Sequence, residues 1–158
     1  MIRGVHHVSF STQDLDAMLG FYCDLLGFQL VKPPFTWAVG FDKLDTVTGM
    51  RGTSGRNALL RAANIYIEIF EYTTPKGRPA DLARRAADVG LTHLCFDVDN
   101  IDSDYQRLAQ AGVQFHCPPQ HLGSALSTYG RDPDGNIFEL QQILDYDKLP
   151  APLLGSQE

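Results

Sequence analysis

The chain repeats one short pattern, and this repeat strongly limits the folds that it can adopt. Residues 4–10 read GVHHVSF and residues 90–96 read GLTHLCF, so each copy carries a histidine three residues after a glycine. Residues that can begin a helix follow both histidines at the same distance, at 14–16 and 100–102. The repeat predicts two copies of one structural unit, each with its own histidine.

Alternation of polar and apolar residues predicts a β-strand at the start of each copy, over residues 5–12 and 93–98. If Val8 and Phe10 pack against helices, His7 lies on the opposite face of its strand. In the second copy, His93 is likewise expected opposite Leu94 and its apolar neighbours. The two histidines are therefore equivalent by position and by face. By the same alternation, the neighbouring His6 is expected on the Val8 face.

Each strand is followed by an amphipathic helix and then by further strands. The helical stripes contain Leu15, Met18, Tyr22 and Leu25 in the first copy, and Ile101, Tyr105 and Leu108 in the second. Asp14 or Asp16 can cap the first helix, and Gly27 and Gly112 can end the two helices. Further strand signals cover residues 28–31, 62–72, 114–115 and 127–142. A strong turn at 132–136, DPDGN, is expected to join two antiparallel strands.

These signals divide the chain into a first module at 4–72, a connector at 73–89, a second module at 90–143 and a tail at 144–158. A helix is predicted over 80–87, within the connector. The first module holds a long segment with glycine, threonine and proline, residues 32–61, that the second lacks. A segment of this kind in a compact domain is typical of a lid or a binding loop.

Composition excludes several classes of protein. Apolar residues make up 44% of the chain and charged residues 20%, and no apolar stretch is long enough to cross a bilayer. The net charge of −6 and the scattered basic residues disfavour nucleic acid as a partner. Three widely spaced cysteines do not form a disulfide framework, and no signal peptide is recognised at the start, so a cytoplasmic location is expected.

A single carboxylate interrupts an otherwise apolar strand in each copy, Glu68 in the first and Glu139 in the second. Burying such a group alone costs several kcal/mol unless a cation or another partner compensates its charge. A solvated sheet face or a salt bridge is the alternative for either glutamate. Glu71 lies at the end of the strand that carries Glu68, on the same side as its isoleucines, and is interpreted as a salt-bridge residue.

Two imidazoles and two carboxylates form a mixed nitrogen and oxygen ligand set, which suits Zn²⁺, Ni²⁺, Co²⁺, Mn²⁺ or Fe²⁺. The predicted metal ligands are His7, Glu68, His93 and Glu139. Open coordination positions would let the metal polarise a substrate carbonyl, and Glu68 and Glu139 are the candidate bases for the adjacent C–H proton. The remaining histidines, His6, His116 and His121, are expected to be structural.

These features resemble the vicinal oxygen chelate superfamily, which includes glyoxalase I, methylmalonyl-CoA epimerase, bleomycin- and fosfomycin-resistance proteins and extradiol dioxygenases. The resemblance covers residues 4–143 and is carried by His7, by 21–28 (FYCDLLGF), 67–69 (IEI), 90–93 (GLTH) and 132–140 (DPDGNIFEL). It implies an α+β fold in which tandem βαβββ modules form a curved mixed sheet around a metal-containing cavity. It also implies a homodimer, and metal ligands at the four positions given above.

The individual members differ in their ligands. The His, Glu, His, Glu set resembles glyoxalase I, but the glutathione-binding arginine and asparagine of that enzyme correspond to Ser11 and Tyr72 here. Methylmalonyl-CoA epimerase usually has glutamine in place of Glu68. Extradiol dioxygenases and fosfomycin-resistance enzymes use two histidines and one glutamate, and bleomycin-resistance proteins bind their drug without these ligands.

The sequence therefore predicts a divalent-metal-dependent lyase or isomerase of the glyoxalase-like type, which abstracts a proton next to a metal-bound carbonyl of a small oxygen-bearing substrate. Aromatic residues that can line its substrate pocket are Phe35, Trp37, Tyr66, Phe70 and Tyr129. Two alternatives stay open, a protein that sequesters a hydrophobic compound and an extradiol-type dioxygenase.

Overall fold

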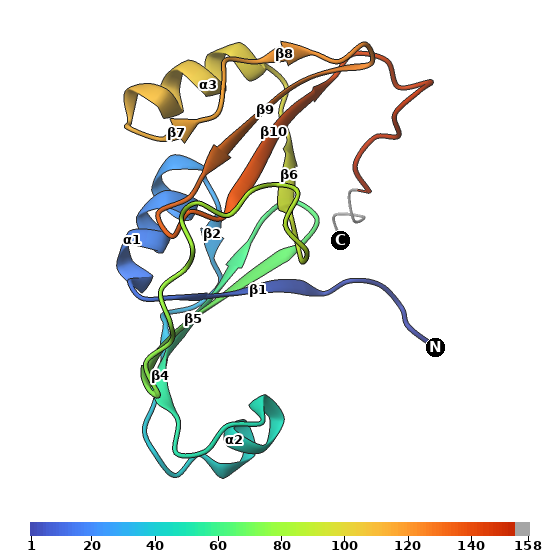
Figure 1. The fold of residues 1–158 in the computed structure, drawn as a ribbon. Coiled ribbons are helices and arrows are strands. Elements are labelled where there is room, and N and C mark those ends of the chain that lie inside the picture. Colours follow the sequence, from blue (N-terminus) through green and yellow to red (C-terminus); the bar gives the residue numbers. More distant parts are fainter. Residues whose placement is uncertain (154–158) are drawn as a thin grey trace. The chain divides into compact units, whose positions relative to one another are not determined.

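A five-stranded mixed sheet forms the framework of the first unit, residues 1–79, in the computed structural model, which describes residues 1–153 (Figure 1). Along the chain, the elements are β1 (His7–Thr12), α1 (Leu15–Leu19), the π-helical turn η1 (Gly20–Leu25), β2 (Gln29–Leu30), β3 (Phe35–Trp37), α2 (Asp42–Thr48), β4 (Ser54–Arg61) and β5 (Tyr66–Thr74). The strand order is β1-β5-β4-β2, with β3 also paired to β4. Among the strand pairs of this unit within residues 1–79, β1 and β5 are parallel and the others are antiparallel.

The second unit, residues 80–153, repeats this topology. Its elements are β6 (His93–Asp97), α3 (Ile101–Gln110), β7 (Gln114–Phe115), β8 (Gln120–His121), β9 (Ala125–Arg131) and β10 (Ile137–Ile143). The strand order is β6-β10-β9-β7, with β8 paired to β9 and a parallel β6–β10 pairing. Each unit is therefore a βαβββ module, to which the first adds β3 and α2. The predicted α+β class with mixed sheets is confirmed.

Each sheet packs one face against the helix of its own unit. In the first unit, the fully buried side chains include those of Leu15 and Met18 from α1, Leu60 from β4, and Ile67 and Ile69 from β5. In the second, Ile101 and Leu108 of α3 pack with Phe138 and Leu140 of β10. The odd-numbered isoleucines of β5 thus occupy the helix-covered face, as their alternation predicts.

Capping side chains fix the start of both helices. Asp14 precedes α1 and accepts a hydrogen bond from the Ala17 N–H at 3.0 Å, and Asn100 does the same for the Ser103 N–H ahead of α3. Such caps satisfy N–H groups that lack a partner in the first turn. The repeat therefore retains its helix start as well as its strand.

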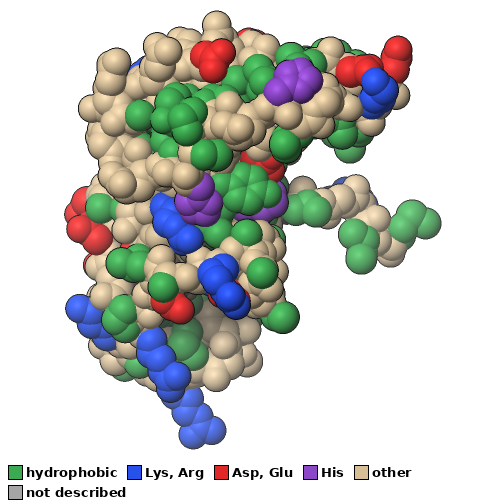
Figure 2. All heavy atoms as spheres, turned by 45° about the horizontal axis from the view of Figure 1, so that its top comes forward, with side chains coloured by type: hydrophobic (Ala, Val, Ile, Leu, Met, Phe, Trp, Pro, Cys, Tyr) green, Lys and Arg blue, Asp and Glu red, His purple; other side chains and the backbone are tan. Residues whose placement is uncertain are grey.

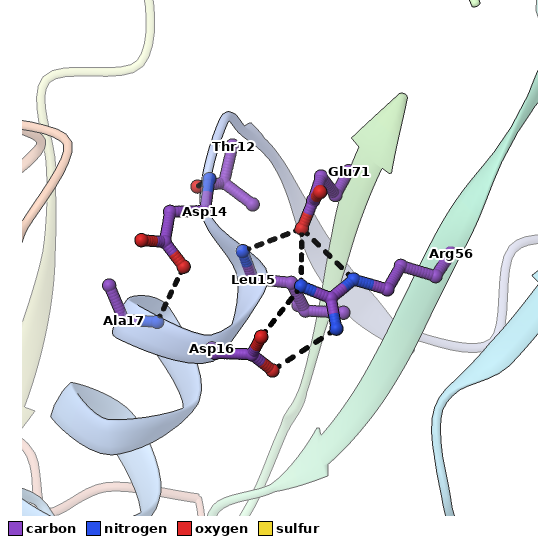
Figure 3. Close-up of polar contacts among 7 residues, drawn as sticks. All are labelled: Thr12, Asp14, Leu15, Asp16, Ala17, Arg56 and Glu71. Atoms are coloured by element: carbon purple, nitrogen blue, oxygen red, sulfur yellow. Dashed lines mark hydrogen bonds and ion pairs between the residues drawn. The ribbon is translucent and has the colours of Figure 1, made fainter. Parts of the chain in front are cut away.

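A charged network attaches the start of α1 to the sheet of the first unit (Figure 3). One oxygen of Glu71 accepts hydrogen bonds from the Leu15 N–H and from Nε and Nη2 of Arg56, and Arg56 also pairs with both oxygens of Asp16. The two carboxylates raise the pKa of the Arg56 guanidinium, and the hydrogen bonds from Arg56 lower the pKa of Asp16. The interpretation of Glu71 as a salt-bridge residue is confirmed.

Three details of the expected secondary structure were wrong. The segment 32–61 contains β3, α2 and β4 rather than an irregular loop, and the strand expected at 62–72 begins only at Tyr66, after a turn closed by the Ala62 N–H and the Ile65 carbonyl. Residues 80–87 form turns instead of a helix. There Asp81 accepts a hydrogen bond from the Ala83 N–H, and Asp88 from the Arg85 N–H, so side chains compete for the donors that a helix needs.

The described part of the tail, residues 144–153, contains turns but no helix or strand, and the end of the expected tail, 154–158, lies outside the described residues. Within residues 1–153, no helix has the length and apolar character needed to span a membrane.

Candidate metal centre

The first unit places His7 beside Glu68 on the face of its sheet that the helix does not cover. Nε2 of His7 lies 3.5 Å from Oε2 of Glu68, and the two side chains are 41% and 23% exposed. The other carboxylate oxygen, Oε1, accepts a hydrogen bond of 2.8 Å from the amide of Asn57 on β4. One oxygen of Glu68 is thus held by the neighbouring strand while the other faces the imidazole.

The second unit builds the same arrangement from His93 and Glu139. Nε2 of His93 lies 3.0 Å from Oε2 of Glu139, and these side chains are 25% and 11% exposed. Oε1 of Glu139 accepts a hydrogen bond of 2.5 Å from the hydroxyl of Ser127 on β9. Nδ1 of His93 is buried and has no hydrogen-bond partner among residues 1–153.

Strand register explains why the two pairs match. His7 lies opposite Tyr66 and His93 lies opposite Ile137 in the parallel pairings, so each glutamate stands two residues beyond the partner of its histidine. On the antiparallel side, Asn57 and Ser127 each stand two residues before the partner of the glutamate. The repeat therefore reproduces the donor that orients each carboxylate, together with the histidine and the glutamate.

The spacing within each pair fits two ligands of one divalent ion. Atoms that each lie about 2.1 Å from an ion are about 3.0 Å apart at a right angle and about 3.4 Å apart at a tetrahedral angle. The observed separations of 3.0 and 3.5 Å match these values. Each unit contains one imidazole and one carboxylate as a pair, and among residues 1–153 no group of three or more His, Cys, Asp or Glu side chains is placed to hold a metal.

Tyr129 and Cys95 flank the pair in the second unit. The ring of Tyr129 lies 4.8 Å from that of His93, and Tyr129 stands directly opposite Glu139 in the sheet. Burial raises the pKa of the Tyr129 hydroxyl, and Glu139 raises it further. Burial also raises the pKa of the Cys95 thiol, to about 12, with help from Glu139, to which the thiol hydrogen-bonds. Both groups therefore stay protonated at neutral pH.

Aromatic side chains flank the pair in the first unit. Trp37 packs edge-to-face against Phe70 and Tyr72, which stack on each other, and the ring of Phe35 stacks against Trp37 at 6.4 Å. Phe41 meets Phe35 edge-to-face, and both of these rings are exposed, at 40% and 46%. Burial and the Glu68 charge raise the pKa of Tyr72. We call these five residues the aromatic cluster.

Of the predicted pocket residues, Phe35, Trp37 and Phe70 lie together in the aromatic cluster. Trp37 is only 5% exposed, so it supports the cluster rather than offering a free surface. Its indole N–H donates to the hydroxyl of the buried Thr53, which in turn donates to Asp45 of α2. The segment that the second copy lacks therefore serves to fix the indole.

The other predicted pocket residues lie beside the histidines of their own units, Tyr129 next to His93 and Tyr66 next to His6. The ring of His6 stacks on Tyr66 at 5.1 Å and contacts His7, so the expected position of His6 on the Val8 face was wrong. Strand β1 begins at His7, and the alternation of the strand does not extend to the residue before it.

The two remaining histidines form no ion pair with a glutamate within residues 1–153. His121 accepts a hydrogen bond from the Gly123 N–H in a turn, which is a structural role. The ring of His116 lies 6.2 Å from that of Tyr129. Sequence reasoning missed Asn57 and Ser127, because only cross-strand register identifies them.

Residues 4–140 match the Glyoxalase/Bleomycin resistance protein/Dioxygenase superfamily. The chain belongs to this superfamily. Its members are also known as vicinal oxygen chelate proteins, so the resemblance seen in the sequence is confirmed. Among curated relatives, the uncharacterized protein YaeR of Escherichia coli is 29% identical over 144 residues, which cover 89% of this chain and 97% of YaeR.

A second relative, a 2-epi-5-epi-valiolone epimerase of Actinomyces sp., is 31% identical over 121 residues, 75% of this chain and 64% of the epimerase. Among solved structures, a glyoxalase family protein of Bacillus cereus aligns with a TM-score of 0.82 at 20% identity, covering 92% of this chain and 97% of that one. The fosfomycin resistance protein FosX of Listeria monocytogenes, complexed with Mn(II) and sulfate, aligns with a TM-score of 0.58 at 18% identity, over 90% and 93% of the two chains. The superfamily thus includes an epimerase and a resistance protein.

Proposed function

We propose that this vicinal oxygen chelate protein is a divalent-metal-dependent lyase or isomerase that removes a proton next to a carbonyl of a small oxygen-bearing substrate. The observation that carries the proposal is the repeated pair, His7 with Glu68 and His93 with Glu139, at separations suited to two ligands of one ion. The epimerase relative supports an isomerisation, and the manganese complex of FosX supports a divalent metal.

In this proposal, His7, Glu68, His93 and Glu139 supply the ligands of one divalent transition metal, of which Zn²⁺, Ni²⁺, Co²⁺, Mn²⁺ and Fe²⁺ suit the donor set. The metal would supply Lewis-acid polarisation of the substrate carbonyl. Each imidazole would use the lone pair of Nε2, the nitrogen that faces its glutamate.

The glutamates would also carry the proton. Oε1 of Glu68 accepts from Asn57, and Oε1 of Glu139 from Ser127, so in each case Oε2 is the oxygen that would act as ligand and that, in a loosely held carboxylate, would exchange a proton with the substrate. Transfer to a positioned carboxylate contributes about 10²–10⁴ in rate. Isomerisation would return the proton to the substrate at another position or on another face, whereas elimination would expel a leaving group from the neighbouring carbon and pass the proton to that group or to water.

The test combines metal binding with proton exchange. Purified protein is titrated with Zn²⁺ and Mn²⁺ by calorimetry, and candidate α-hydroxycarbonyl and cyclic ketone substrates are incubated in D₂O to detect exchange at the carbon next to the carbonyl. We expect one ion per chain, and exchange that falls about 10²-fold or more in Glu68→Gln and Glu139→Gln.

Glu71→Gln provides the matched control, because Glu71 lies on the same strand as Glu68 but belongs to the Arg56 network. This variant should lose stability and keep its metal. Unchanged exchange in both Glu68→Gln and Glu139→Gln would rule out the proton-transfer mechanism.

A second candidate function is sequestration of a hydrophobic compound, which the exposed rings of Phe35 and Phe41 favour. The only tryptophan, Trp37, stacks against Phe35 and would report an apolar ligand by a change in fluorescence. Tight binding by metal-free protein, with no proton exchange in any metal-loaded form, would support sequestration over catalysis.

We also propose that the chain forms a homodimer, which light scattering after gel filtration would measure.

A further inference from the structure

His6 makes a side-chain contact that its exposed position would not suggest. Its Nδ1 lies 2.9 Å from Nδ1 of His7, with the two rings perpendicular. The ring of His6 is held from its other side by stacking on Tyr66, at 5.1 Å and 21°. The His6 carbonyl also accepts the Tyr66 N–H, which anchors the backbone of His6 to β5. Histidine side chains reach the surface of the molecule in Figure 2, and His6 and His7 are both exposed.

A separation of 2.9 Å between two ring nitrogens requires one of them to donate and the other to accept. If His6 donates, His7 carries its own proton on Nε2, and that nitrogen has no lone pair for a metal. If His7 donates from Nδ1, its Nε2 presents a lone pair on the side of Glu68. The direction of this one hydrogen bond therefore decides whether His7 can be a ligand.

We propose that His6 is a positioning residue that accepts the Nδ1 proton of His7 and so holds His7 in its metal-binding tautomer. Ligating histidines commonly donate their second ring nitrogen to such an acceptor, which fixes the tautomer and the orientation of the ring. This inference rests on the proposed function, because it assigns His7 as a ligand.

The imidazole rings of His7 and His93 are restrained by their surroundings to different degrees. The side chain of His93 is 25% exposed and its Nδ1 is buried, so packing restrains its ring. His7 is 41% exposed and lies at the end of a strand, where packing restrains it less. The second copy has Thr92 in place of His6, which has no imidazole to offer. An imidazole acceptor is thus present at the copy whose histidine is more exposed.

Two variants separate the hydrogen bond from the stacking. His6→Phe keeps an aromatic ring that can stack on Tyr66 but removes the acceptor, and His6→Asn keeps an acceptor oxygen near the position of Nδ1 but removes the ring. Calorimetric titration of the full chain with Zn²⁺ should show a Kd about 10-fold or more weaker for His6→Phe. His6→Asn should stay within about 3-fold of the wild type, as expected if acceptance matters and stacking does not.

Nuclear magnetic resonance provides the second measurement. In metal-free protein with ¹⁵N-labelled histidine, long-range ¹H–¹⁵N spectra should show the proton of neutral His7 on Nδ1 in the wild type. A proton on Nε2 of His7 in the metal-free protein, or equal Zn²⁺ affinity in the wild type and His6→Phe, would overturn the role of His6 without excluding a metal site. A wild type that binds no metal would instead contradict the proposed function itself.

Discussion

Gly55 is the position where the structure predicts the sharpest effect of one added methyl group. This residue is buried on β4, beside a register shift in the β4–β5 pairing. A Cβ at Gly55 would lie 2.8 Å from the Trp37 ring and in severe overlap with the Glu71 carbonyl oxygen, against ordinary contacts of 3.4–4 Å. The carbonyl belongs to the paired strand, so either β4 must move away from β5 or the indole must leave its place.

Overpacking of this kind costs about 1–3 kcal/mol, so Gly55→Ala should lower the free energy of unfolding by about that amount. For a chain of this size, the expected fall in Tm is about 2–12 °C. Trp37 is the only tryptophan and contacts this position, so its fluorescence follows both the unfolding transition and any displacement of the ring in the folded variant.

Gly77→Ala is the matched control, because a methyl group there would meet nothing within 4 Å. Its stability should stay the same or rise by up to about 1 kcal/mol, through the lower entropy of the unfolded chain. Urea unfolding of the two variants and the wild type gives the comparison. Equal stability of Gly55→Ala and Gly77→Ala, with an unchanged Trp37 spectrum, would refute the packing around the aromatic cluster.

Three further predictions concern charged and reactive groups. Hydrogen bonds from the Thr53 hydroxyl and from backbone N–H groups lower the pKa of Asp45 below 3.8, so its stabilising effect is complete above about pH 4 and is lost as the pH falls through the lowered value. Urea unfolding should therefore find a larger stability deficit of Asp45→Asn relative to the wild type at pH 7 than at pH 3; an equal deficit at both would contradict this. Cys95 and Cys117 are both exposed, but the pKa of about 12 predicts that Cys95 reacts more slowly with Ellman's reagent at pH 8, measured on single-cysteine variants, and faster reaction of Cys95 would contradict it. Arg56→Met should cost about 1–2 kcal/mol in thermal unfolding because it breaks the bonds to Glu71, whereas Arg85→Met, from an exposed pair, should cost less than about 0.5 kcal/mol. Similar losses in the two arginine variants would mean that the network does not stabilise the first unit.

Local periodicity was enough to predict the elements that carry the candidate ligands. The alternation around His7 and His93, and the helical stripes that follow, depend only on neighbouring residues, and the structure forms β1, α1, β6 and α3 there. The carboxylates were also recognisable, because Glu68 and Glu139 interrupt apolar strands. These signals are local, and the structure agrees with them.

The features that sequence reasoning missed depend on contacts between distant residues. Strand β4 was not predicted from the sequence because Gly55, Arg56 and Asn57 are weak strand formers. Their partners on β5 are known only from the strand pairing in the structure. The helix expected at 80–87 had suitable apolar spacing, but the Arg84 carbonyl accepts a hydrogen bond from Arg131, far along the chain. Strand pairing in one segment and a tertiary hydrogen bond in the other determine the local structure that is observed.

The differences between the two copies are as informative as their agreement. Register places Leu59 opposite Glu68 but Tyr129 opposite Glu139, so one glutamate has an apolar neighbour across the strand and the other has a hydroxyl-bearing ring. The donor to the carboxylate is the amide of Asn57 in one copy and the hydroxyl of Ser127 in the other. The neighbours differ while the histidine and glutamate positions match, so under the proposed function the surroundings of each glutamate are where the two copies would act differently on a substrate.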